Sequence, residues 1–228
     1  MPMRLLLDPP ADDATNALAI GCFASLCRDR LAEPLMAFAA ACPDVGVGVH
    51  EMGFAELLPA VATRRLALAI RPGDAESGFA GVDLWGDRAV VALHPTHPLA
   101  AVSAVDAAML RDEIMLLSRD RARAQLHRFL ADRLFARDAP ATRMPATRMV
   151  ADARRCQLLE RVADGEGITL LCESQVDFGM ANLCIKPLHD RAARFRLRAY
   201  WRHDQDQPAL AQLVAMIAAS REPDLAAV

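Results

Sequence analysis

The spacing of hydrophobic and polar residues predicts alternating strands and helices over the first third of the chain. Runs of apolar residues or strict alternation indicate strands, and apolar residues at helical spacing indicate helices. The predicted segments are a strand at 18–23, a helix at 31–42, a strand at 45–49, a helix at 55–63 and a strand at 66–70. Strands that alternate with helices favour a parallel sheet with helices on both faces.

A second series follows the Pro- and Gly-bearing turn at residues 71–74. It comprises a long strand at 82–93, a helix at 105–111, a strand at 114–117, a helix at 123–136, a strand at 148–151, a helix at 153–163, a strand at 168–171, a short helix near 174–180, a strand at 185–188, a strand at 195–201 and a helix at 208–219. Because the last strand and helix need a sheet to join, we expect the chain to return to the first unit.

This order predicts an α/β protein of two Rossmann-like lobes joined by two crossover strands. We expect residues 1–16, with their polar Asp-Pro-Pro run, to be a flexible leader. The expected lobes are residues 17–87 with 196–228, and residues 88–195. A ligand cleft is expected between the lobes, because ligands of open α/β sheets bind beyond the carboxyl ends of the strands. Helix N-termini there offer N–H groups to an anion.

The composition is that of an ordinary folded domain, with 24% charged and 54% hydrophobic residues among 228. A net charge of -3, from 26 Lys+Arg and 29 Asp+Glu, lacks the basic excess of a chain that contacts nucleic acid. The N-terminal stretch lacks a signal peptide pattern and no apolar run is long enough to span a membrane, so a cytoplasmic location is expected.

The six cysteines form neither a CxxC motif nor a cluster spaced as zinc ligands; they are Cys22, Cys27, Cys42, Cys156, Cys172 and Cys184. In a reducing compartment, most are expected to be small buried residues. Cys22 and Cys27 flank a loop expected at the cleft, so an accessible thiol there is the alternative.

Catalytic motifs are missing as well: nucleophile elbows, phosphate loops, HExxH and GxGxxG are not found. His94 and His97 are close in sequence but have no nearby carboxylate ligand in the chain, so a lobe connection is favoured over a metal site. The acidic residues Asp106, Asp112, Glu113 and Asp120 are expected at helix starts or in solvent rather than as an acid–base pair. We expect neither an enzyme nor a cofactor or metal.

Several blocks resemble, in order, the effector-binding domain of LysR-type transcriptional regulators. They are residues 18–26 (LAIGCFASL) with Pro43-Asp44-Val45, 50–53 (HEMG) and 66–70 (LALAI), then 84–93 (LWGDRAVVAL) with His97-Pro98-Leu99-Ala100, then 162–171 (VADGEGITLL). The similarity covers about residues 17–219. Residues 50–53 and 92–99 are most similar to regulators of aromatic-compound catabolism. The resemblance implies a fold like that of type II periplasmic binding proteins.

The resemblance also implies a function. Such a domain senses a small organic effector, expected to bear a carboxylate, and self-associates as a dimer or tetramer. In this family, an N-terminal winged helix-turn-helix and linker helix contact promoter DNA. Neither is found in this sequence, so the chain is expected to be the sensing part, with RNA polymerase as a further candidate partner and no membrane partner.

Candidate effector contacts follow from loop position and from the resemblance. They are Ala24, Ser25, Gly53, Phe54, Arg71, Thr96, Ser118, Arg119, Arg123 and Asp152. Ser25 matches a hydroxyl that relatives place against a ligand carboxylate. Phe54 replaces a threonine usual in those relatives, which removes a hydrogen-bond donor and favours a flatter, less polar ligand. Arg119 and Arg123 offer guanidinium forks for a carboxylate, or lie in solvent.

Three other functions are considered. A solute-binding protein for transport shares the predicted fold but would need an export signal. An enzyme on this scaffold would need a nucleophile with a base. Redox sensing is the third, although the cysteine pair of the family's peroxide-sensing branch is not found, since residues 119–137 contain no cysteine. The apolar residues from Leu26 to Phe38 suit either the core or a self-association surface.

Overall fold

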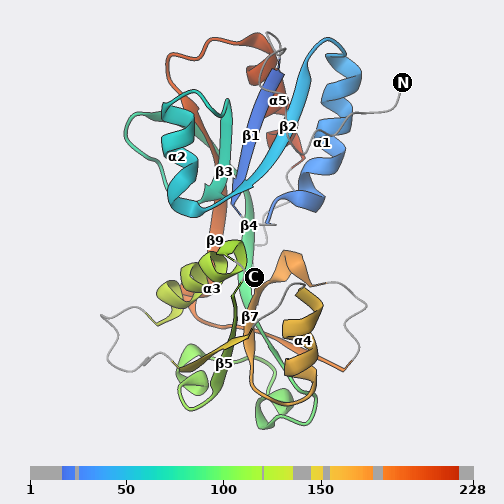
Figure 1. The fold of residues 1–228 in the computed structure, drawn as a ribbon, viewed down its shortest axis with the longest axis vertical. Helices are drawn as coiled ribbons and strands as arrows, with labels where there is room; N and C mark the ends of the chain where they lie inside the picture. Colours follow the sequence, from blue (N-terminus) through green and yellow to red (C-terminus); the bar gives the residue numbers. More distant parts are fainter. Residues whose placement is uncertain are drawn as a thin grey trace. The chain divides into compact units, whose positions relative to one another are not determined.

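The computed structural model describes residues 17–23, 26–119, 121–135, 145–150, 155–176 and 182–220, without the side chains of residues 28, 29, 121–123, 155 and 156. The chain forms two compact units (Figure 1). One unit extends to Gly86 and resumes at Arg196, and the other extends from Asp87 to Phe195. The predicted leader, residues 1–16, lies outside the described residues.

The first unit is a sheet covered by helices. Its elements are β1 (Ala17–Phe23), α1 (Arg28–Ala41), β2 (Gly46–Met52), α2 (Phe54–Ala62), β3 (Leu68–Pro72), the first part of β4 (Phe79–Leu93), most of β9 (Arg194–Arg202) and α5 (Pro208–Ala219). Strand β1 pairs in parallel with β2 and β3, and β3 pairs antiparallel with β9. The predicted parallel sheet is therefore confirmed for the first three strands, whereas the returning strand β9 makes the sheet mixed.

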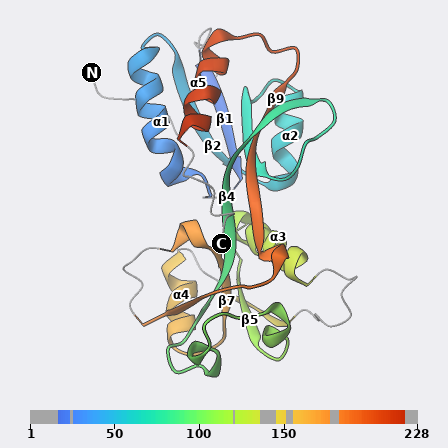
Figure 2. The same ribbon diagram turned by 180° about the vertical axis from the view of Figure 1, so that it is seen from behind.

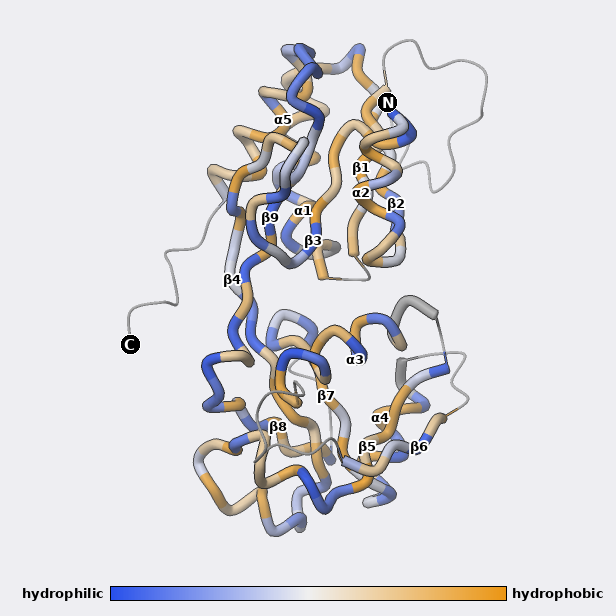
Figure 3. Tube along the Cα trace, turned by 90° about the vertical axis from the view of Figure 1, so that its left-hand side faces the viewer, coloured by the Kyte–Doolittle hydropathy of each residue, from blue (hydrophilic) through white to orange (hydrophobic). Residues whose placement is uncertain are grey.

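Helices α1 and α5 pack together on one face of this sheet, and α2 lies on the other (Figures 1 and 2). Strand β1 lies between β2 and β3, and hydrophobic residues run along it (Figure 3). Its Ile20 and Phe23 are fully buried. Helix α1 turns its apolar stripe inward, since Leu31 and Phe38 are at most 1% exposed. The sequence left open whether this stripe packs in the core or forms a self-association surface. The structure places it in the core.

The second unit contains the rest of β4 and a smaller α/β arrangement. Its further elements are two 3-10 turns, Pro98–Ala101 and Ala107–Leu110, then β5 (Ile114–Ser118), α3 (Arg121–Leu134), β6 (Ala146–Val150), α4 (Arg155–Ala163), β7 (Thr169–Cys172), β8 (Cys184–Pro187) and the 3-10 turns Glu173–Gln175 and Arg191–Ala193. Strands β5 and β6 are parallel, and β4 pairs antiparallel with β7 and β8. Val90, Leu116, Leu158 and Leu171 belong to one buried apolar cluster.

The chain passes between the units within β4 and within β9. On the second unit's side, Asp87 accepts hydrogen bonds from the Ser174 hydroxyl at 2.6 Å and from the Arg88 N–H at 2.8 Å. In the first unit, the Arg198 guanidinium binds Asp83 at 2.5 Å and the Gly81 carbonyl at 2.8 Å. Polar contacts therefore hold the strands at both passages.

Two predicted helices are wrong or incomplete. Residues 105–111 form only a 3-10 turn at Ala107–Leu110, because Val105 is tied to Leu188 in a strand-like bridge. A turn this short gains too few hydrogen bonds to continue as an α-helix. The described start of the short helix predicted near 174–180 is a 3-10 turn at Glu173–Gln175, and the prediction is untested at residues 177–180, which lie outside the described residues. Over the described part of the chain, no helix is both long and apolar enough to cross a membrane.

Candidate functional site

Gly53 and Phe54 lie at the carboxyl end of β2, where α2 begins. The Gly53 N–H donates to the Glu56 carboxylate at 3.0 Å, so a side chain of the same helix already uses this donor. The Phe54 ring meets the Phe23 ring edge to face, with centroids 5.4 Å apart. Part of the apolar surface of Phe54 is therefore packed against Phe23 of the same unit.

Arg71 lies near the carboxyl end of β3, at the same edge of the parallel strands as Phe54. Its side chain is only 7% exposed, and a charged group this deeply buried needs partners to offset its loss of contact with water. The Cζ atom lies 4.2 Å from the Phe54 ring centroid, and Glu76 forms an ion pair with its NH2 group. The buried Nε has no hydrogen-bond partner among the described residues. The sequence-predicted pair Phe54 and Arg71 is thus brought together.

Tyr200 of β9 is a third residue in contact with Arg71, after Phe54 and Glu76. The Arg71 Cζ lies 5.3 Å from the Tyr200 ring centroid, and the Tyr200 hydroxyl donates to the Asp74 carbonyl at 2.6 Å. Burial raises the pKa of Tyr200 above its ordinary value, while the charges of Arg71 and Arg198 oppose that rise. The phenol therefore stays neutral and fixes the turn after β3.

In the second unit, Ser118 and Arg119 lie at the carboxyl end of β5. Ser118 is fully buried, and its backbone N–H donates to Nδ1 of His127 at 3.4 Å. Because Nδ1 accepts, a neutral His127 carries its proton on Nε2. Arg119 has an exposed side chain and a backbone N–H that donates to the Val150 carbonyl at 3.0 Å. Of these two predicted residues, only Arg119 presents its side chain to solvent.

Thr96 does not join Ser118. It follows the end of β4, which runs antiparallel to β7, while β7 runs parallel to β5 through the Met115–Ile168 bridge. Thr96 therefore belongs to the opposite end of these strands from Ser118. Its hydroxyl lies 2.8 Å from Nδ1 of His94, so it serves the local turn.

The second histidine of that turn does have a carboxylate neighbour, which sequence spacing missed. Nε2 of His97 lies 3.1 Å from Glu113, and this contact joins the turn to the start of β5. Within the described part of the chain, no group of three His, Cys, Asp or Glu residues is placed to hold a metal ion. His97 thus has a structural partner in Glu113, whereas His94 contacts Thr96.

Four predicted contacts lie outside what the structure describes. Ala24, Ser25 and Asp152 are outside the described residues, and Arg123 belongs to α3 without a described side chain. Their contribution to a site stays a prediction.

Comparison with known proteins identifies the family. The sequence of residues 11–221 matches the protein-family model described as the LysR substrate binding domain. The chain belongs to this family. The LysR substrate-binding domain is the effector-binding domain of LysR-type transcriptional regulators, so the predicted family and fold class are confirmed. The comparison with curated proteins gave no match.

Solved structures with the same fold include effector-binding domains of other regulators. The BenM effector binding domain with its effector benzoate has a TM-score of 0.70 at 22% identity, covering 90% of this chain and 91% of that one. The reduced OxyR regulatory domain from Pseudomonas aeruginosa has 0.68 at 18% identity, covering 90% and 98%. The C-terminal domain of a probable LysR family regulator from Rhodococcus sp. RHA1 has 0.70 at 22% identity, covering 89% and 98%.

Three residues of this LysR domain were missed from the sequence: Glu76, His127 and Tyr200. The position of His127 beside Leu126 on the apolar stripe of α3 was an available signal, because a buried histidine needs a polar partner. Glu76 and Tyr200 reach Arg71 from 5 and 129 residues away along the chain, and spacing alone does not indicate such contacts.

The expected burial is confirmed for Cys22, Cys27 and Cys172, and the alternative of an accessible thiol at Cys22 or Cys27 is wrong. Cys22 and Cys27 are 2% and 1% exposed, because both side chains pack into the core of the first unit. Cys172 is also buried, and Cys42 and Cys184 are half-buried. All five are free thiols in the structure. Cys156 has no described side chain.

Proposed function

We propose that this LysR substrate-binding domain senses a small organic ligand that bears a carboxylate. The family match over residues 11–221 carries the assignment as an effector-binding domain. BenM, with the same fold, is described with its effector benzoate, an aromatic carboxylate. The proposal that our chain recognises this class rests on its own residues, beginning with Arg71.

Arg71 supports a carboxylate ligand through its charge and surroundings. The guanidinium is packed between the Phe54 and Tyr200 rings, which restricts its movement before any ligand binds. Its ion-pair partner Glu76 is 46% exposed, so a ligand carboxylate is able to replace it without breaking the core. The Phe54 ring offers an apolar surface for a flat ligand body beside the charge.

Titration calorimetry with benzoate as the probe tests this proposal. Loss of a hydrogen bond to a charged group costs about 1.5–3 kcal/mol, so Arg71→Gln is expected to weaken binding by about 10- to 150-fold. Glu76→Gln is expected to strengthen binding, because it removes the competing carboxylate. Ser25→Ala tests the predicted hydroxyl contact and is expected to weaken binding.

The matched control is Arg111→Gln, an arginine of the second unit that donates to the Ala108 carbonyl. It is expected to leave the affinity for benzoate unchanged. Equal affinity for wild type and Arg71→Gln, with both proteins folded by circular dichroism, contradicts the role of Arg71.

We also propose that the domain self-associates. Strand β2 lies at an edge of the sheet, and its residues from Val47 to His50 are only half-buried. Met36 on the neighbouring helix α1 is 60% exposed. Analytical ultracentrifugation tests the proposal: a concentration-dependent dimer that Met36→Glu weakens supports it, and a monomer at all concentrations contradicts it.

The remaining parts of the proposal concern DNA binding, cellular location and the absence of catalysis. We propose that DNA is contacted by a different segment of a longer regulator, since 26 basic residues against 29 acidic ones do not favour phosphate contacts here. We further propose a cytoplasmic regulator that binds its effector without converting it. Recovery of unchanged benzoate after prolonged incubation with the protein is the expected result.

A further inference from the structure

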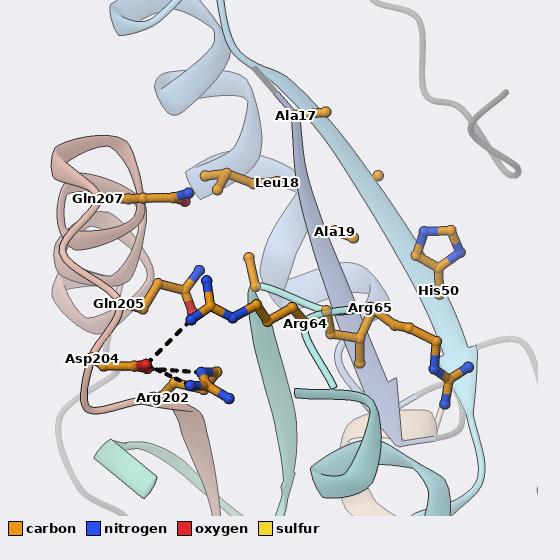
Figure 4. A pocket seen from close by; sticks show the side chains of 13 residues that line it. Ala17, Leu18, Ala19, His50, Arg64, Arg65, Arg202, Asp204, Gln205 and Gln207 are labelled. Atoms are coloured by element: carbon orange, nitrogen blue, oxygen red, sulfur yellow. Dashed lines mark hydrogen bonds and ion pairs between the residues drawn. The ribbon is translucent and has the colours of Figure 1, made fainter. Parts of the chain in front are cut away.

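A cavity of about 500 Å³ lies in the first unit, around the start of β1 (Figure 4). Sites for small molecules commonly have volumes of about 300–1,000 Å³. The cavity is lined by residues from β1, β2, the α2–β3 turn, the end of β9 and the β9–α5 turn: Ala17, Leu18, Ala19, Gly48, His50, Arg64, Arg65, Leu66, Ala67, Arg202, Asp204, Gln205 and Gln207.

The fold leaves this space open for two reasons. Strand β3 begins with Leu68, which is paired with Ile20, so β3 does not extend alongside Ala17 and Leu18. On the neighbouring strand, Gly48 pairs with Ala19, and neither residue has a side chain large enough to fill the hollow. Leu18 and Leu66 add apolar area to the lining.

One side of the cavity carries a fixed charge network. Asp204 binds Nε of Arg202 at 2.7 Å and the Arg64 guanidinium at 3.3 Å, while NH1 of Arg202 donates to the Ala62 carbonyl at 2.7 Å. The hydrogen bond from Arg202, with its charge and that of Arg64, lowers the pKa of Asp204. Asp204 therefore stays ionised and holds both arginines at the rim.

The cations outnumber the anions among the described lining residues. The lining contains three guanidinium groups, those of Arg64, Arg65 and Arg202, and a single carboxylate, that of Asp204. Figure 4 shows Arg64 extending toward Asp204 and Arg65 extending the other way, toward the strand that carries His50. Neither the Arg65 side chain nor the His50 side chain has a hydrogen bond or ion pair to another described residue. An uncompensated positive charge thus remains beside an apolar lining.

We propose that this pocket binds a small organic oxyanion, a carboxylate or a phosphate monoester, with Arg65 as its main charge partner. The amides of Gln205 and Gln207 supply further hydrogen-bond donors, and Leu18 and Leu66 contact the apolar body of the ligand. The site is separate from that of Arg71 and Phe54, because those residues lie at the carboxyl ends of β3 and β2, whereas Ala17 and Ala67 lie at the amino ends of β1 and β3.

The test is titration calorimetry of the full chain with two probes, inorganic phosphate and benzoate, at low ionic strength. We expect saturable binding of at least one probe, and Arg65→Gln is expected to weaken it by about tenfold, the effect of about 1.4 kcal/mol. Binding is also expected to weaken with added salt, because the pocket is open to solvent. Preference for phosphate assigns a phosphate ligand, and preference for benzoate assigns a carboxylate with an apolar body.

Two further variants locate the binding. Arg64 has a backbone φ of 62°, so Arg64→Gly keeps this left-handed turn while removing a second cation, and it is expected to weaken binding as well. Arg111→Gln, outside the pocket, is expected to leave binding unchanged. The proposal is overturned if neither probe saturates, if Arg65→Gln binds as wild type does, or if only Arg71→Gln weakens binding.

Discussion

The guanidinium carbon of Arg71 lies 4.2 Å from the centroid of the Phe54 ring, which joins the end of β3 to the start of α2. We expect this contact to contribute about 0.5–2 kcal/mol, since a cation packed on an aromatic face gains more when it is desolvated. A double-mutant cycle with Phe54→Leu and Arg71→Lys, measured by urea unfolding, isolates the coupling energy.

The pair Phe195 and Arg133 in the second unit provides the comparison. Its Cζ-to-centroid distance is 5.8 Å, so its coupling is expected to be smaller. A coupling between Phe54 and Arg71 no larger than that of the control pair contradicts the assigned contact.

Gly21 in β1 is a position where a single methyl group is expected to destabilise the fold. A Cβ there would lie 2.3 Å from Cδ1 of Leu66 and 2.7 Å from Cδ2 of Leu57, so these two buried side chains would have to move within the core. Gly21→Ala is expected to cost about 1–3 kcal/mol of unfolding free energy, as overpacking does. Gly46→Ala in the paired strand β2 has its nearest contact at 3.7 Å and is expected to be nearly neutral. Equal urea midpoints for the two variants would argue against close packing at Gly21.

Tyr200 is the only tyrosine in the chain, so phenolate absorbance reports this residue alone. Burial raises the pKa of Tyr200 from 10.0, and the native protein is expected to ionise at higher pH than the urea-denatured chain. The folded state disfavours the phenolate, so this contribution to stability is fully present below pH 10.0 and is lost as the pH rises through the raised pKa. Tyr200→Phe is expected to remove this contribution to the loss of folding stability at alkaline pH. Coincident titrations of native and denatured protein would contradict the prediction.

Thiol labelling is expected to separate the cysteines by burial. In a Cys156→Ser background, Cys42 and Cys184 are expected to react first, because they are half-buried, whereas Cys22, Cys27 and Cys172 are at most 2% exposed. Peptide mass spectrometry of partly labelled protein measures the order. Labelling of Cys22 or Cys27 at the rate of Cys42 would show that the first unit opens readily near β1.

Local pattern was sufficient for most of the secondary structure. Alternating valines and apolar runs marked β2 and β3, and the spacing of Leu210, Leu213 and Ile217 marked α5, since burial on one face imposes a period on the sequence. The pattern failed at residues 105–111, where one tertiary bridge from Val105 to Leu188 replaces a helical turn. A window of sequence does not contain the partner that makes such a bridge.

Some features of the candidate site were also predictable from the sequence, whereas others depend on the tertiary structure. Phe54 and Arg71 were predictable, because the carboxyl ends of parallel strands meet at one edge. The burial of Ser118 against His127 and the separation of Thr96 from it depend on how β4, β5 and β7 are paired.

The sequence by itself determined the family, the order of elements and the α/β class, because these follow from local spacing and from ordered blocks of residues. Only the tertiary structure decided which charges meet. Glu76 and Tyr200 surround Arg71, and Arg202 and Arg64 share Asp204, through contacts that cross up to 140 residues of chain. Interactions between charged side chains depend on their separation in space. Separation along the sequence does not indicate which of these side chains are close together in the fold.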